Sequence, residues 1–131
     1  MVSSATQAGN RLLARRRYAE AEAAFRQSLS AFPGEVQAAR GLATALARQN
    51  KHEEVVKELS TQATSMGSPS LDALLADSPR VMVFRGKNEY ADTAISFYLR
   101  SLSQKQDPVA YYYLGLLYEE IKTDRIKAVE A

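Results

Sequence analysis

The stretch AGNRLLARRRYAEAEAAFRQSLSAFP, residues 8–33, decides the fold of this chain. It contains two amphipathic helical patterns that meet near Tyr18. Pro33 and Gly34 stop the second pattern, because proline cannot continue a helix and glycine tolerates the turn that follows. The stretch therefore predicts a pair of short helices with apolar faces.

The apolar positions of this stretch return 34 residues later. The equivalent positions are Ala8 and Leu42, Gly9 and Ala43, Leu12 and Leu46, Ala21 and Val55, Phe25 and Leu59, and Pro33 and Gly67. A fixed period of this length is typical of a helical solenoid, in which each unit buries its apolar face against its neighbours. The spacing predicts helices at about 3–16, 18–31, 35–48 and 53–65.

Residues 70–106 depart from the period. Leu71, Leu74 and Leu75 predict a short helix that Pro79 interrupts, with one further helical turn after it. A clear helix is expected from Tyr90 to Ser103, with either Phe97 or Tyr98 in the core position. About five extra residues are placed between Gly67 and Pro79.

The last unit is expected to begin at Pro108, since proline is favoured at the first position of a helix. Tyr111, Leu114, Gly115 and Tyr118 share one helical face and are expected in the core. A second helix is predicted to begin at Thr123.

These positions and the period resemble the tetratricopeptide repeat (TPR) family. The matching residues are Gly9, Tyr18, Ala21, Phe25 and Pro33 in the first unit, and Tyr111, Leu114, Gly115 and Tyr118 in the last. The resemblance implies an all-α, right-handed solenoid of about four helix-turn-helix units, at 2–34, 36–68, 69–106 and 108–131. The third is divergent and the last incomplete, as in a fragment of a longer protein or a module whose end another chain covers. Sel1-like repeats are the near relative, because they share the Leu-Gly spacing of the last unit.

Composition limits the classes of function. The 131 residues carry a net charge of +2 and no cysteine, and no apolar run approaches the ~20 residues of a membrane span. Arg15, Arg16 and Arg17 form a basic run that Glu20 and Glu22 follow, which favours a solvated helix end over a phosphate site. We therefore expect no nucleic acid and no membrane insertion, and a cytoplasmic location with the nucleus as the alternative.

The sequence offers no catalytic constellation. His52 is the only histidine and occupies the position of Tyr18 one period later, so a packing or surface role is expected. The pairs Glu53-Glu54 and Glu119-Glu120 diverge by about 100° on a helix and do not form an acid–base pair. We expect no enzyme activity, no metal and no cofactor.

The resemblance implies a concave groove lined by the first helix of each unit. Its register assigns to this groove Thr6, Asn10, Leu13, Arg40, Thr44, Arg48, Tyr112 and Leu116. Thr6 and Gly41 replace the lysine and asparagine with which one TPR class clamps acidic chaperone tails, so that clamp is not expected. Tyr112 is either an exposed anchor for a partner or a side chain that packs on the third unit.

The sequence thus predicts a non-catalytic protein–protein interaction module, a scaffold or adaptor that binds a peptide or helix in the groove. The alternative is a structural oligomerisation segment that packs, through its uncapped last unit, on itself or on the rest of a larger TPR protein. A regulatory domain of an enzyme encoded elsewhere in the gene is the third interpretation.

Overall fold

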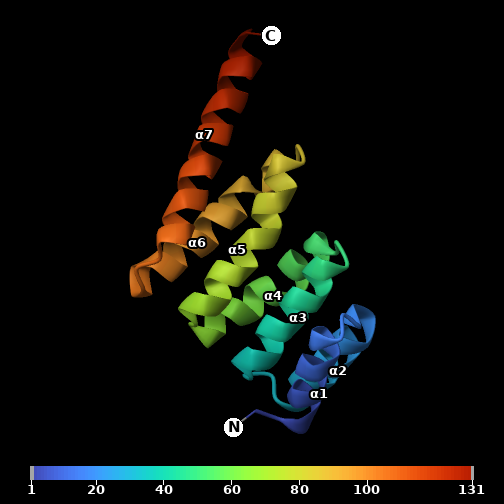
Figure 1. Ribbon diagram of the computed structural model, residues 1–131. Helices are drawn as coiled ribbons and strands as arrows, with labels where there is room; N and C mark the ends of the chain where they lie inside the picture. The colour runs from blue at the N-terminus through green and yellow to red at the C-terminus, as the bar shows by residue number, and fades with distance from the viewer. Residues whose placement is uncertain (1, 131) are drawn as a thin grey trace.

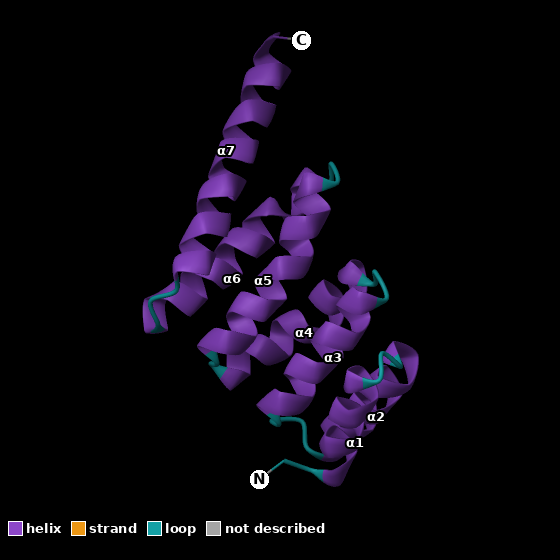
Figure 2. Ribbon diagram, viewed as in Figure 1, coloured by secondary structure: helices purple, strands orange, loops and turns teal. Residues whose placement is uncertain are grey.

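The computed structural model describes residues 2–130, without the side chains of residues 124, 126–128 and 130. Within them every element is helical (Figure 2). The elements are α1 (Ser4–Ala14), α2 (Tyr18–Ala31), α3 (Val36–Arg48), α4 (His52–Met66), α5 (Pro69–Phe84), the 3₁₀ turn η1 (Asn88–Tyr90), α6 (Ala91–Gln104) and α7 (Pro108–Glu130). The first four helices agree with the sequence prediction to within one or two residues.

The helices stack in chain order, from α1 and α2 at one end of the molecule to α7 at the other (Figure 1). Each helix contacts the next one along the chain, and α1, α3, α5 and α7 also contact one another in succession. Such contact between neighbouring units is how a helical repeat builds one continuous core. The predicted all-α helical repeat is confirmed.

The ring of Phe25, which is completely buried, joins the first three helices. A Cβ atom built on Gly9 of α1 would lie 2.6 Å from the Phe25 ring, and one built on Gly41 of α3 would lie closer still. Both helices can therefore approach the ring only because these positions lack side chains. The sequence predicted the role of Gly9 but not that of Gly41.

The turn between the two helices of a unit recurs three times with the same geometry. Its middle residue is Arg16, Asn50 or Gly86, and each has a positive φ, of 61°, 62° and 94°. The next N–H in each turn donates to a carbonyl five residues back, at Leu12, Leu46 and Met82. The spacing between turns is 34 residues and then 36, so the first helix of the third unit keeps nearly the same register.

The predicted break at Pro79 is wrong, because α5 runs unbroken for 16 residues through this proline. Pro79 has no N–H to donate to the carbonyl of Leu75, but its ring is fully buried. It stands 36 residues after Ala43, at the position where Gly9 and Ala43 meet their second helices. Tertiary packing along α5 outweighs the lost hydrogen bond.

The extra residues of the third unit are not between Gly67 and Pro79. Helix α5 is three residues longer than the 13-residue α3, and η1 adds a further turn before α6. After this turn Ala94 and Tyr98 are buried as Ala21 and Phe25 are. Phe97 is also buried, at 5% exposure.

The predicted second helix at Thr123 is also wrong, because α7 is a single helix of 23 residues (Figure 1). Tyr111 and Tyr118, which were expected in the core, are each half exposed. The residues of α7 that are buried against α5 and α6 are Ala110, Leu114 and Leu117. They correspond to Ala38, Leu42 and Ala45 of α3, 72 residues earlier.

A buried ion pair ties α5 to α6. The Asp72 carboxylate is completely buried, and Arg100 donates to it through Nη2 at 2.7 Å and Nε at 3.3 Å. Arg100 also donates to Thr64 of α4 at 3.0 Å. Burial raises the pKa of Asp72 above its ordinary value, while the Arg100 guanidinium acts in the opposite direction. The pair therefore depends on Arg100 to keep the carboxylate charged.

We predict opposite effects for the same substitution at two helical glycines. Gly41→Ala forces a methyl group into the Phe25 ring, and overpacking of about 1–3 kcal/mol outweighs the ~1 kcal/mol that alanine gains in a helix. Gly115→Ala meets nothing within 4 Å, so it should stabilise the protein by up to about 1 kcal/mol. Urea unfolding measures both, and equal effects would contradict the packing described around Phe25.

We also predict that Arg100→Ala lowers the free energy of unfolding by about 3 kcal/mol at neutral pH, because it leaves the Asp72 carboxylate buried without its partner. The loss should shrink as the pH falls through the raised pKa of Asp72, since protonation removes the unpaired charge. Adding Asp72→Asn should restore part of the loss. Lys87→Ala, which breaks an exposed pair with Glu53, is the control and should change little. A loss independent of pH would contradict this account.

Candidate interaction surface

The outer side of α1, α3, α5 and α7 forms one continuous surface, because these four helices contact one another in sequence. We call it the first-helix surface. The turn register relates positions along it, so that Asn10, Thr44, Arg80 and Leu116 are equivalent, as are Arg48 and Phe84. The residues assigned to the groove from sequence fall on it with one exception.

The exception is Thr6, whose side chain is completely buried. Its hydroxyl lies 2.6 Å from that of Ser28, which donates to the Glu35 carboxylate at 2.8 Å. The backbone N–H of Ser3 donates to the same carboxylate at 2.9 Å. Thr6 thus belongs to a polar cluster that joins α1, α2 and the start of α3, and it is not accessible to a partner.

The other predicted residues of the first two units differ in exposure. Asn10 and Arg48 are exposed, whereas Leu13 is half-buried and packs on the core. Arg40 is half-buried, and its Nε is enclosed and has no protein acceptor among the described residues. Thr44 donates its hydroxyl to the Arg40 carbonyl at 2.9 Å. Arg48 is therefore the cation of this group that a ligand reaches most easily.

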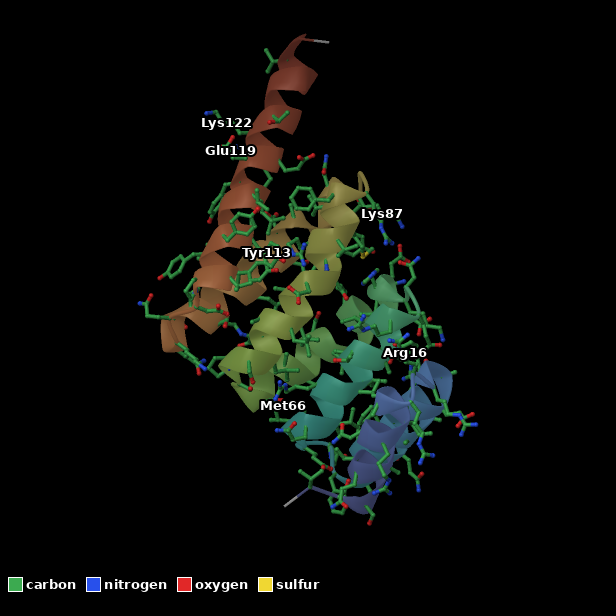
Figure 3. The ribbon with its side chains drawn as sticks, in the orientation of Figure 1. Arg16, Met66, Lys87, Tyr113, Glu119 and Lys122 are labelled. Carbon is green, nitrogen blue, oxygen red and sulfur yellow. The ribbon has the colours of Figure 1, made fainter. Side chains whose placement is uncertain are left out.

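The aromatic part of the surface lies between α5 and α7. Tyr112 is 64% exposed and Leu116 36%, so neither is buried on the third unit. The Tyr112 ring lies 5.5 Å from the ring of Tyr113, which points from α7 toward α5 (Figure 3). The guanidinium of Arg80 covers the Tyr113 ring at 3.8 Å. An exposed tyrosine thus stands on a supporting aromatic–cation stack.

Hydrogen bonds hold this stack in place from below. The buried Tyr98 hydroxyl donates to Asp77 at 2.8 Å and accepts from Arg80 Nε at 2.9 Å. Its ring stacks on Tyr113 at 6.2 Å. Burial and the neighbouring Asp77 carboxylate raise the pKa of Tyr98 well above its ordinary value. Tyr98 therefore stays protonated and keeps donating at neutral pH.

Sequence reasoning missed two residues of this surface, Arg80 and Phe84. Arg80 is the cation of the stack, and Phe84 is 45% exposed at the end of α5. Both were lost when Pro79 was interpreted as a break. Gly86 was the available signal, since it stands 36 residues after Asn50 and marks the same turn.

Other chemistry is sparse in the described part of the chain. His52 is half-buried with Nδ1 2.9 Å from the Ser78 hydroxyl, and burial and Arg85 lower its pKa. No cluster of three or more potential metal ligands occurs among the described residues. No helix in the described part of the chain has both the length and the apolar character needed to cross a membrane.

Comparison with known families agrees with this architecture. A family model described as tetratricopeptide repeat matches residues 12–77, which is 66 of the 131 residues. The matched segment runs from the end of α1 through the middle of α5. Comparison with curated protein sequences finds no matching relative.

We predict that the stack loses stability in alkali because of Tyr98. The raised pKa of Tyr98 makes its contribution complete below pH 10, the ordinary value, and lost as the pH rises toward the folded-state value. Tyr98→Phe should cost about 1 kcal/mol at neutral pH and flatten the fall in unfolding free energy above pH 10. Tyr111→Phe is the control, because that residue is half exposed. Parallel pH profiles for the wild-type protein and Tyr98→Phe would contradict the prediction.

Proposed function

Because the chain belongs to the tetratricopeptide repeat family, we propose that it is a non-catalytic module that binds a peptide or a partner helix. Proteins of this family mediate protein–protein interaction. The role proposed for this chain is that of a scaffold or adaptor, with the ligand lying along the first-helix surface. The observation that carries the proposal is the exposed ring of Tyr112 on its supported stack.

Tyr112 has the properties of a binding anchor. Tyrosine is enriched among the residues that dominate binding energy, because its ring buries a large area at a small cost in side-chain entropy. Here the supporting ring of Tyr113 is already fixed by Arg80 and Tyr98. Less order is lost when a ligand covers a side chain that its neighbours already restrain. Leu116, one turn further along α7, extends the apolar area.

The charge of the surface favours a ligand with acidic residues at one end. Arg48 is exposed at the end of α3, and Asn10 on α1 adds a polar side chain. Apolar and aromatic side chains, with Phe84 among them, lie at the α5–α7 end. A ligand with a carboxylate near Arg48 and an apolar residue on Tyr112 would match both ends.

Self-association is the second candidate function. It is favoured by the side of α7 that carries Tyr111 and Tyr118, both 50% exposed. The corresponding side of α3 is buried, with Ala39 at 1% and Leu46 at 0% exposure. This side is separate from the first-helix surface, because Tyr112 and Leu116 point about 100° away from it on the helix.

The first proposal is tested with peptides selected for binding to the full chain from a random library of about 12-residue sequences. Affinities are then measured by fluorescence anisotropy. Tyr112→Ala should weaken binding about tenfold or more, since it removes the anchor. Arg48→Glu should weaken the binding of acidic peptides, and more strongly at low salt.

Tyr111→Ala is the matched control, because it removes an exposed tyrosine from the neighbouring position on the same helix. Its effect on peptide affinity should be small. Selected peptides that bind Tyr112→Ala and Arg48→Glu as tightly as the wild-type chain would overturn the proposed site.

A further inference from the structure

One side of α7 carries six exposed residues at alternating spacings of four and three. They are Tyr111, Gly115, Tyr118, Lys122, Arg125 and Val129. Val129 is 87% exposed, and a Cβ built on Gly115 would meet nothing within 4 Å. This spacing is the one at which two helices pair along a continuous seam. We call these residues the α7 stripe.

The α7 stripe begins on a face that is covered in an earlier unit. The α3 residues equivalent to Tyr111, Gly115 and Tyr118 are all at most 3% exposed, and α4 and α5 contact that helix. They are Ala39, Ala43 and Leu46. Within residues 2–130 no helix follows α7 to cover its stripe. A second helix would complete the packing there.

A hollow marks the place of the missing helix. It has a volume of about 510 Å³ and lies between α6 and the middle of α7. Asp92 and Ile95 line it from α6, and Tyr118, Lys122 and Arg125 line it from α7. The wall of the hollow therefore includes three members of the α7 stripe.

Helix α7 cannot supply this cover to itself while it is straight. Lys122 follows Gly115 by seven residues, as Arg16 follows Gly9 and Asn50 follows Ala43. Arg16 and Asn50 have positive φ and reverse the chain, but α7 continues through Lys122. Figure 3 places Lys122 and Glu119 on the side of α7 away from α5, with the rest of the helix continuing beyond the body.

We propose that the occupant is α7 of a second copy of this chain, paired antiparallel about a two-fold axis near residue 120. This inference rests on the self-association candidate and specifies its geometry. The register follows from the symmetry of the stripe, whose spacings read 4-3-4-3-4 in both directions. The two-fold axis pairs Tyr111 with Val129 of the partner subunit, Gly115 with the partner's Arg125, and Tyr118 with the partner's Lys122.

Each of the three layers joins complementary groups. Tyr111 and Val129 bury apolar area against each other. The long Arg125 side chain crosses the space above Gly115, which has no side chain of its own. The Lys122 ammonium lies over the face of the Tyr118 ring, a favourable cation–π arrangement. Each layer occurs twice, so the contact is closed and self-complementary.

A parallel pair would be unfavourable by comparison. It would place Lys122 against Lys122 and Arg125 against Arg125, two layers of like charge inside the seam. The antiparallel pair also matches the fold, since the two helices of a unit are joined by a tight turn and run in opposite directions (Figure 1). The partner's α7 would thus stand in for the second helix of the last unit.

The test uses single cysteines in the full chain, which has no cysteine of its own. Tyr111→Cys and Val129→Cys are mixed in equal amounts under mild oxidation. The antiparallel register predicts a disulfide between the two different variants, with little cross-linking of either variant to itself. The pair Gly115→Cys and Arg125→Cys should behave in the same way. Homodimers of each variant would instead reveal a parallel pair and overturn the proposal.

Sedimentation equilibrium tests the association itself. The wild-type chain should show a monomer–dimer equilibrium, and Lys122→Glu should raise the dissociation constant about tenfold or more, because it removes the cation over Tyr118 and adds charge beside Glu119. Lys57→Glu, an exposed reversal on α4, is the control. A monomer at every concentration overturns both self-association and the register. A dimer without the mixed disulfide overturns the register alone, and neither result affects the peptide site.

Discussion

The close contact of α1, α2 and α3 around one aromatic ring is the constraint on which the rest of the stack depends. Phe25 is buried completely, and the positions facing it on α1 and α3 are glycines. This contact fixes how the first unit meets the second. The later units repeat the arrangement with other residues, Leu59 on α4 and Tyr98 on α6. A repeat protein passes its geometry along the chain in this way, from each unit to its neighbour.

The first two units were predictable because their period is undisturbed. The 34-residue return places the same small and apolar residues at the same contacts, and the helix ends fall where expected. The third unit was not, because a local rule about Pro79 conflicted with tertiary packing, and packing prevailed. The last helix was mispredicted for a related reason. Its equivalent turn position is Lys122, and nothing there compels a positive φ as glycine or asparagine would favour.

The candidate site divides along the same line. The exposure of Tyr112 and Arg48 followed from helical periodicity and the family register. The burial of Thr6 did not, because it depends on Ser28 and Glu35, which only the folded chain brings together. Arg80 was likewise invisible without its three-dimensional neighbours, since its role is to cover Tyr113. Their function in binding remains a prediction, supported by exposure and by the stack beneath Tyr112.

Helix α7 separates two kinds of interaction on one element. Its Tyr112 side continues the surface of α1, α3 and α5, whereas its Tyr111 side is the face that another helix covers in α3. Hydrogen–deuterium exchange of the full chain, with and without a selected peptide, tests the central claim most directly. The account predicts slower exchange in α7 around Tyr112 and at the end of α3 near Arg48. Protection confined to α2, α4 and α6 would contradict it.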